Sequence, residues 1–151
     1  MIVVDAVRCR NPRRPFDYKQ VLHRGTATGK GPDMKYLCLI YDNHSAMAGM
    51  SKAEVDAFMG EYFAFTTAIR ESGHFVAGDE LQPVQTATTV RVRGGKVSTT
   101  DGPFAETKEQ LGGYYLIEAR DLNDAIQVAS RIPSARTGCV EVRPIVVHAG
   151  M

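Results

Sequence analysis

Residues 101–109 bring several chemically capable side chains into one short segment, Asp-Gly-Pro-Phe-Ala-Glu-Thr-Lys-Glu. Carboxylates beside a lysine can be tuned for proton transfer when they are partly buried, and loops on a rigid sheet commonly carry binding groups. We therefore predict five ligand-binding residues in this segment: Asp101, Phe104, Glu106, Thr107 and Lys108. The alternative is structural, with a turn at Asp-Gly-Pro and solvated charges after it.

Tyrosines form the second group of candidate ligand-binding residues. Each joins a large apolar ring to a hydroxyl that needs a partner when it is buried. We predict that Tyr41, Tyr62 and Tyr115 line a pocket. Tyr114 and Tyr115 are neighbours in an expected strand, so their side chains should point to opposite faces of the sheet. One should meet the helices and pack in the core, and the other should meet the open face.

Histidines could act as bases, but the sequence shows no ordered pair of a base and an orienting residue. His44 stands in a turn and His74 beside a glycine that ends a helix, so we expect both at the surface. Arg91 and Arg93 alternate with valines, which is typical of the solvated face of a ribbon. No nucleophile elbow, zinc-protease motif or dinucleotide fingerprint occurs. Catalytic residues are therefore left unassigned.

Composition excludes several classes of protein. With 44% hydrophobic and 23% charged residues in 151, the chain has the make-up of an ordinary globular domain. Cys9, Cys38 and Cys139 lie far apart and show no metal-ligand spacing, so we expect no metal site and no disulfide framework. We also expect no cofactor, since no dinucleotide fingerprint occurs. No apolar run reaches the roughly 20 residues of a membrane span, and no signal peptide is visible. We expect a reduced, cytoplasmic protein.

Charge divides the chain into two parts. Residues 1–33 hold seven basic and three acidic side chains, which leaves eleven basic and fourteen acidic residues in 34–151. The net-acidic body argues against a nucleic-acid surface on the folded domain. The first part, 1–33, shows no periodicity, and we expect a disordered leader, or sequence that precedes the true start at Met34. A basic tail that binds nucleic acid or a membrane is the alternative.

The first half of the body predicts a strand, a helix and a second strand. The run KYLCLIYD is continuous and β-prone, as in a buried strand. Ser51 and Glu54 form a capping box ahead of an amphipathic helix. Gly73 ends that helix, and HFVAGDEL follows as a short strand.

The second half predicts a hairpin, a strand, a helix and a last strand. The hairpin QTATTVRVRGGKVSTTDG turns at Gly94 and Gly95, and GGYYLIEA is the next strand. Asp121 caps a second helix, which carries Ile132 and closes at Pro133. The last strand is CVEVRPIVV.

This order predicts an α+β domain with the ferredoxin-like split βαβ pattern and one inserted β-hairpin. Two amphipathic helices can cover only one face of an antiparallel sheet. A second copy of the sheet is the simplest cover for the other face, so we predict a homodimer of the dimeric α+β barrel type.

Residues 99–126, TTDGPFAETKEQLGGYYLIEARDLNDAI, closely resemble the DGPF subgroup of the YCII-related proteins. The likeness extends to MKYLCLIYD, LQPVQTATTVRVRGGK and VEVRPI, and so to nearly all of 34–148. It implies a small bacterial domain of the dimeric α+β barrel type without an established general activity. Some such proteins are encoded beside sigma factors.

The wider family carries a His and an Asp that are proposed as a catalytic pair. The resemblance places the His at the position of Phe63, so this chain lacks it, and the Asp corresponds loosely to Asp79. Two functions follow as hypotheses. One is a small-molecule pocket between the sheet face, the DGPF loop and the dimer partner, with cofactor-free proton transfer if the protein is an enzyme. The other is a non-catalytic interaction or regulatory protein linked to transcription.

Overall fold

The computed structural model describes residues 34–43 and 49–147. They belong to the compact unit Pro32–Met151. The expectations for 1–33 and for His44 concern positions outside the described residues.

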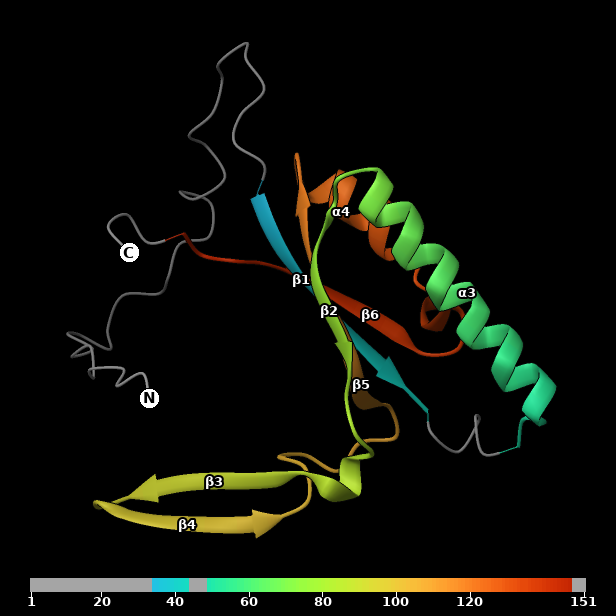
Figure 1. Ribbon diagram of the computed structural model, residues 1–151. Coiled ribbons are helices and arrows are strands. Elements are labelled where there is room, and N and C mark those ends of the chain that lie inside the picture. Colours follow the sequence, from blue (N-terminus) through green and yellow to red (C-terminus); the bar gives the residue numbers. More distant parts are fainter. Residues whose placement is uncertain (1–33, 44–48, 148–151) are drawn as a thin grey trace. The chain divides into compact units, whose positions relative to one another are not determined.

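The main sheet has four strands in the order β2-β5-β1-β6 (Figure 1). Their bounds are Met34–Asp42 for β1, Phe75–Glu80 for β2, Gln110–Ala119 for β5 and Cys139–Pro144 for β6. Each neighbouring pair is antiparallel. The domain is thus α+β, as predicted, and its strand order is compatible with the ferredoxin-like fold. The dimeric barrel stays a prediction.

Both helices, α3 (Lys52–Glu71) and α4 (Leu122–Ala129), lie on the same side of this sheet, to its right in Figure 1. Strand alternation directs every second side chain of β1 and β5 toward them. The core is therefore a single cluster between helices and sheet, made by Tyr36, Cys38, Ile40, Phe65, Ile69, Tyr115, Ile117, Ala119, Ala125, Val128, Ala129 and Ile132.

Helix α3 begins and ends where its local signals predict. Ser51 accepts a hydrogen bond from the Glu54 amide, and the Glu54 carboxylate accepts one from the Ser51 amide. Gly73 has φ +77°, a left-handed conformation that glycine adopts without strain. The His74 amide donates to the Ile69 carbonyl over 2.9 Å and the Gly73 amide to Arg70 over 3.1 Å, which is a Schellman ending.

Helix α4 is shorter than predicted. Asp121 caps it as expected, accepting from the Asp124 amide, but the helix ends at Ala129 rather than running to Pro133. Ile132 has extended backbone angles, φ −63° and ψ 126°, because the residue before a proline is disfavoured in the helical conformation. Pro133 instead opens the 3-10 helix η2 (Pro133–Arg136). Ile132 is still only 1% exposed, so its predicted place in the core is confirmed.

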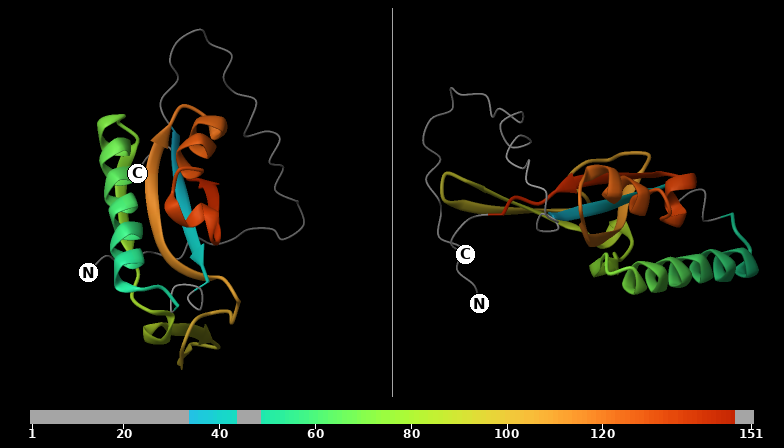
Figure 2. Two further views of the ribbon diagram at one scale, coloured as in Figure 1. Left: turned by 90° about the vertical axis from the view of Figure 1, so that its right-hand side faces the viewer. Right: turned by 90° about the horizontal axis from the view of Figure 1, so that it is seen from above.

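Strands β3 (Thr88–Arg93) and β4 (Lys96–Asp101) form the predicted hairpin as a separate two-stranded sheet, reached through the 3-10 turn η1 (Val84–Thr86). Gly94 and Gly95 both have positive φ, as a two-residue type I′ turn requires. Figure 2 shows the ribbon from two further sides. No helix among the described residues is long and apolar enough to cross a membrane.

Candidate functional site

A pocket of about 350 Å³ opens between α3 and the sheet, where β1 and β2 end and β5 begins. Its walls are mostly apolar and aromatic: Ile40, Phe58, Met59, Tyr62, Phe63 and Tyr115. The two buried side chains of helix α3, Phe65 and Ile69, lie in its C-terminal half. The N-terminal half therefore forms one wall of the pocket instead of packing closely on the sheet.

Glycines form part of the pocket lining on the sheet side. Gly78 of β2 and Gly112 and Gly113 of β5 all line it. A Cβ at position 78 would lie 2.5 Å from Cδ1 of Tyr115, and one at position 113 would lie 3.0 Å from the Asp79 carbonyl oxygen. Larger residues would collide with the sheet or with Tyr115. Glycine within a strand commonly marks such a close approach.

A chain of hydrogen bonds runs from the pocket wall into the sheet. Ser134 of η2 is completely buried and donates from Oγ to Oδ2 of Asp42 over 2.9 Å. Its Oγ also lies 2.6 Å from the hydroxyl of Tyr62. The Ser134 hydroxyl has one proton, which goes to the carboxylate, so Tyr62 is the donor in the second bond. The order of donation is Tyr62 to Ser134 to Asp42.

A second pair of hydroxyls extends this network. Thr66 donates from Oγ1 to the Tyr62 carbonyl over 2.8 Å, one helical turn back, and its Oγ1 lies 2.7 Å from the Tyr115 hydroxyl. Since the Thr66 proton is used, Tyr115 donates to Thr66. The Tyr115 ring is held by edge-to-face contacts with Phe65 and Phe75, at 5.2 and 6.4 Å between ring centroids.

Burial affects the acidity of the tyrosine in this chain. Desolvation raises the pKa of Tyr62 above its usual value, and the negative charge of Asp42 adds to the shift. Tyr62 therefore keeps its proton at neutral pH. It can donate this proton to Ser134 while its oxygen accepts from a bound molecule.

The predicted tyrosines divide between the two faces of the sheet. Tyr62 and Tyr115 line the pocket, whereas Tyr41 does not. Tyr114 lies on the opposite face from Tyr115, as strand alternation predicts, and donates to Oδ2 of Asp79 over 2.8 Å.

The five candidates of the DGPF loop lie outside this pocket. Asp101, Phe104, Glu106, Thr107 and Lys108 are all exposed, Phe104 to 83%. Thr107 bonds locally, from its hydroxyl to the Glu109 carbonyl over 2.5 Å. The described residues do not bring the loop side chains together with the tyrosines, and their role in binding stays a prediction.

Sequence reasoning missed three polar residues of the pocket. Asp42, Thr66 and Ser134 were not among the predicted ligand-binding residues. One signal was present. The paired glycines at the start of the GGYYLIEA strand indicate close approach by a ligand or by another part of the chain.

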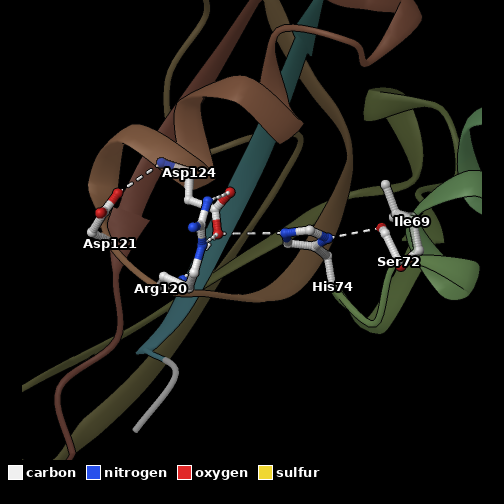
Figure 3. Close-up of polar contacts among 6 residues, drawn as sticks. All are labelled: Ile69, Ser72, His74, Arg120, Asp121 and Asp124. Atoms are coloured by element: carbon white, nitrogen blue, oxygen red, sulfur yellow. Dashed lines mark hydrogen bonds and ion pairs between the residues drawn. The ribbon is translucent and has the colours of Figure 1, made fainter. Parts of the chain in front are cut away.

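His74 forms a second polar cluster, shown in Figure 3, and is not the surface residue that we expected. Its side chain is only 21% exposed. Nδ1 lies 2.8 Å from the Ser72 hydroxyl, and Nε2 lies 3.5 Å from Oδ2 of Asp124. The Schellman ending of α3 turns His74 toward the first turn of α4, a contact that depends on tertiary packing.

Asp124 is the centre of this cluster. Arg120 donates to it from the backbone amide and from both Nε and Nη2, at 3.0 to 3.1 Å. Hydrogen bonds from Arg120 hold the pKa of Asp124 well below its usual range, and His74 adds to this effect. The Ser-His-Asp composition is shared with hydrolases, but none of these residues lines the described pocket. The cluster ties the end of α3 to the start of α4.

Comparison with known proteins identifies the family. The model of the YCII-related domain matches residues 34–148. The chain belongs to the YCII-related family. It is also 37% identical over 117 residues to an uncharacterized protein of Rhizobium meliloti (strain 1021), which covers 76% of this chain and 94% of that protein. The resemblance deduced from the DGPF segment is thus confirmed.

Two positions that the family resemblance singled out lie at the same pocket. Phe63 and Asp79, the positions that the resemblance matched to the proposed catalytic pair, both line it. Phe63 cannot transfer a proton, and Asp79 accepts from Tyr114. Asp42, Ser134, Tyr62 and Tyr115 supply further polar groups at this place.

Proposed function

We propose that this YCII-related domain binds a small molecule in the pocket beneath α3. The observation that carries the proposal is the combination of an apolar aromatic wall with the hydrogen-bonded chain Tyr62, Ser134 and Asp42. Ligand sites commonly pair apolar walls with a few convergent polar groups, and 350 Å³ lies at the lower end of their usual range of about 300 to 1,000 Å³. A small ligand fits this size.

If the protein is an enzyme, the polar chain also supports the cofactor-free proton transfer that we expected in that case. A bound acid could pass its proton to the Tyr62 oxygen while Tyr62 passes its own to Ser134 and Ser134 passes its own to Asp42. Each hydroxyl then regains one proton, and Asp42 ends protonated. The distances of 2.6 and 2.9 Å are normal for such hydrogen bonds.

The proposal also includes the dimer partner and the DGPF loop as further parts of the binding site. Because the loop residues are exposed, they could reach a ligand only through a neighbouring copy of the chain or through movement of the loop. Exposed Phe104, and Val90, Val92 and Val97 on one face of the β3-β4 hairpin, give apolar surface for such a contact. The same surface favours the second candidate, an interaction or regulatory protein without catalysis.

A thermal-shift screen against metabolites, with the full chain, tests the proposal. A ligand that binds only the folded state must raise the melting temperature. The expected hits lose their shift in Ser134→Ala and in Met59→Trp, which fills the pocket. They keep it in Glu106→Gln and Lys108→Met if the pocket alone binds them.

The result also separates the two candidate functions. Compounds that still raise the melting temperature of Met59→Trp would favour the interaction protein. So would a screen without any hit, if a defined protein partner is captured through the hairpin. Loss of the shift in Glu106→Gln as well as in Ser134→Ala would place the loop at the site.

A further inference from the structure

The directions of the hydrogen bonds in the pocket indicate what kind of ligand it takes. The hydroxyl protons of Tyr62, Ser134, Thr66 and Tyr115 are all used within the protein. The tyrosine oxygens can therefore offer only lone pairs to a bound molecule, and a carboxylate offers only lone pairs as well. The polar side of the pocket is a set of acceptors that needs a ligand rich in donors.

The charged residues around the pocket also favour a ligand rich in donors, and in particular a cation. Asp42 is the last acceptor of the network, and Glu80 also lines the pocket. Glu80 shares a sheet face with Gly78, whose missing Cβ would point at Tyr115, so its side chain is on the pocket side. No Lys, Arg or His is among the described residues that line the pocket. Arg136, close to Ser134 in sequence, pairs with Glu61 outside it.

The aromatic wall suits a cation with an apolar body. Phe58, Tyr62, Phe63 and Tyr115 line the pocket, and the Phe58 and Tyr62 rings meet edge to face at 5.4 Å. A cation near the face of an aromatic ring is attracted by the negative potential of the ring. An anionic ligand would face carboxylates and hydroxyl lone pairs instead.

We infer that the pocket selects a small organic cation, a primary ammonium group on an apolar body, with the ammonium directed at Asp42 and the tyrosine oxygens. This inference rests on the proposed pocket function and adds the ligand class to it. An ammonium has three donors and no acceptor, which complements the acceptors of the site.

Three probes of similar shape test the ligand class on the full wild-type chain at neutral pH: benzylamine, benzyl alcohol and benzoate. Binding is followed by amide chemical shifts of the protein during titration. We expect benzylamine to shift the resonances of β1, α3 and β5 residues that line the pocket. Its affinity should be at least about 10-fold higher than that of benzyl alcohol, with benzoate weakest.

Variants identify the group that selects the charge. Asp42→Asn keeps an oxygen that can accept from Ser134, so it should retain the fold, yet it should reduce the preference for benzylamine over benzyl alcohol to about 3-fold or less. Asp56→Asn is the matched control, because it removes an exposed carboxylate of α3 that does not line the pocket. It should leave the preference unchanged.

The outcomes separate this inference from the proposal beneath it. If benzyl alcohol or benzoate binds as tightly as benzylamine and shifts the amide resonances of the pocket as much, the inference of a cationic ligand is wrong, although a ligand pocket is supported. If no probe shifts these resonances, the inference of a cationic ligand is also wrong. If the metabolite screen also fails, the pocket function falls with it. An unchanged preference in Asp42→Asn would overturn the role of Asp42.

Discussion

Tyr115 can lie against β2 because position 78 has no side chain. A Cβ there would stand 2.5 Å from Cδ1 and 2.8 Å from Cε1 of the ring, which is closer than atoms approach in real proteins. The ring is 8% exposed and packs between Phe65 and Phe75, so it has little room to move. Gly78 thus fixes both a core contact and a wall of the pocket.

Gly78→Ala should lower the free energy of unfolding by about 1 to 3 kcal/mol, the usual cost of forcing extra volume into a packed core. Urea unfolding measures the loss. Gly60→Ala is the matched control, since nothing lies within 4 Å of a Cβ at that position in α3. There the same exchange should stabilise the protein by up to about 1 kcal/mol, because alanine favours a helix interior. Equal stability of Gly78→Ala and wild type would remove this role for the glycine.

The lowered pKa of Asp124 should make the stability of the protein depend on pH. Arg120 and His74 lower its pKa in the folded state, so the unfolded state binds the proton more readily. The stabilisation is fully present above the unfolded pKa of about 3.9 and is lost as pH falls toward the lower folded value. Asp124→Asn removes it, and we expect a loss of about 1 kcal/mol at pH 7, since Arg120 is largely exposed.

Urea midpoints at pH 7 and pH 3 measure this effect. The difference between wild type and Asp124→Asn should shrink at the lower pH. Asp56→Asn, an exposed carboxylate paired with Lys52, should change the unfolding free energy by less than about 0.5 kcal/mol. A gap between wild type and Asp124→Asn that stays constant with pH would contradict the role of the Asp124 charge.

At the scale of elements, α3 has two halves with different tasks. The C-terminal half packs in the core through Phe65 and Ile69, and the N-terminal half depends on its capping box. Few buried contacts allow local opening at low cost. The wall of the pocket is therefore expected to be its more mobile side, which would let a ligand enter between α3 and the sheet.

Ser51→Ala should lower the free energy of unfolding by about 1 kcal/mol, because the Glu54 amide loses its acceptor. Hydrogen exchange locates the effect. Amides near Glu54 to Phe58 should exchange faster, while those near Ile69 keep their protection. The control substitution Ser130→Ala changes the C-terminal cap residue of α4 and should leave the protection of α3 amides unchanged. Uniform acceleration along the whole of α3 would show that the helix opens as one unit.

At the scale of the whole molecule, the β3-β4 hairpin supports the predicted homodimer. Val92 and Val97 face each other across the ribbon beside Val90, and all three are more than half exposed. A two-stranded ribbon is marginally stable by itself, so an apolar face of this kind favours a partner. A second copy of the chain is the simplest one.

Light scattering should give twice the 16.5 kDa of one chain. Val92→Lys should shift the protein toward the monomer at low concentration. Ser98→Lys places the same charge on the opposite face of the ribbon, where Ser98 faces Arg91, and should leave the dimer intact. A mass of one chain at every concentration would contradict the dimer, and equal effects of the two variants would place the interface elsewhere.

Local sequence patterns were enough to predict the strands, the start of each helix and the family. The capping box at Ser51, the left-handed Gly73 and the Gly94-Gly95 turn are rules of neighbouring residues, so they can be recognised without the rest of the chain. Alternation in Tyr114 and Tyr115 likewise assigned one ring to the core. The match to the YCII-related family followed from the DGPF segment and its flanks.

Tertiary structure alone decided the site. Asp42 and Ser134 are 92 residues apart and meet because β1 ends beside η2, while Tyr62 joins them from a helix 72 residues before Ser134. His74 meets Asp124 only when α3 and α4 lie side by side on one sheet. No local spacing encodes such contacts, because they depend on strand order and on the packing of helices. For the same physical reason the chemically dense DGPF loop drew attention first, while the pocket formed elsewhere.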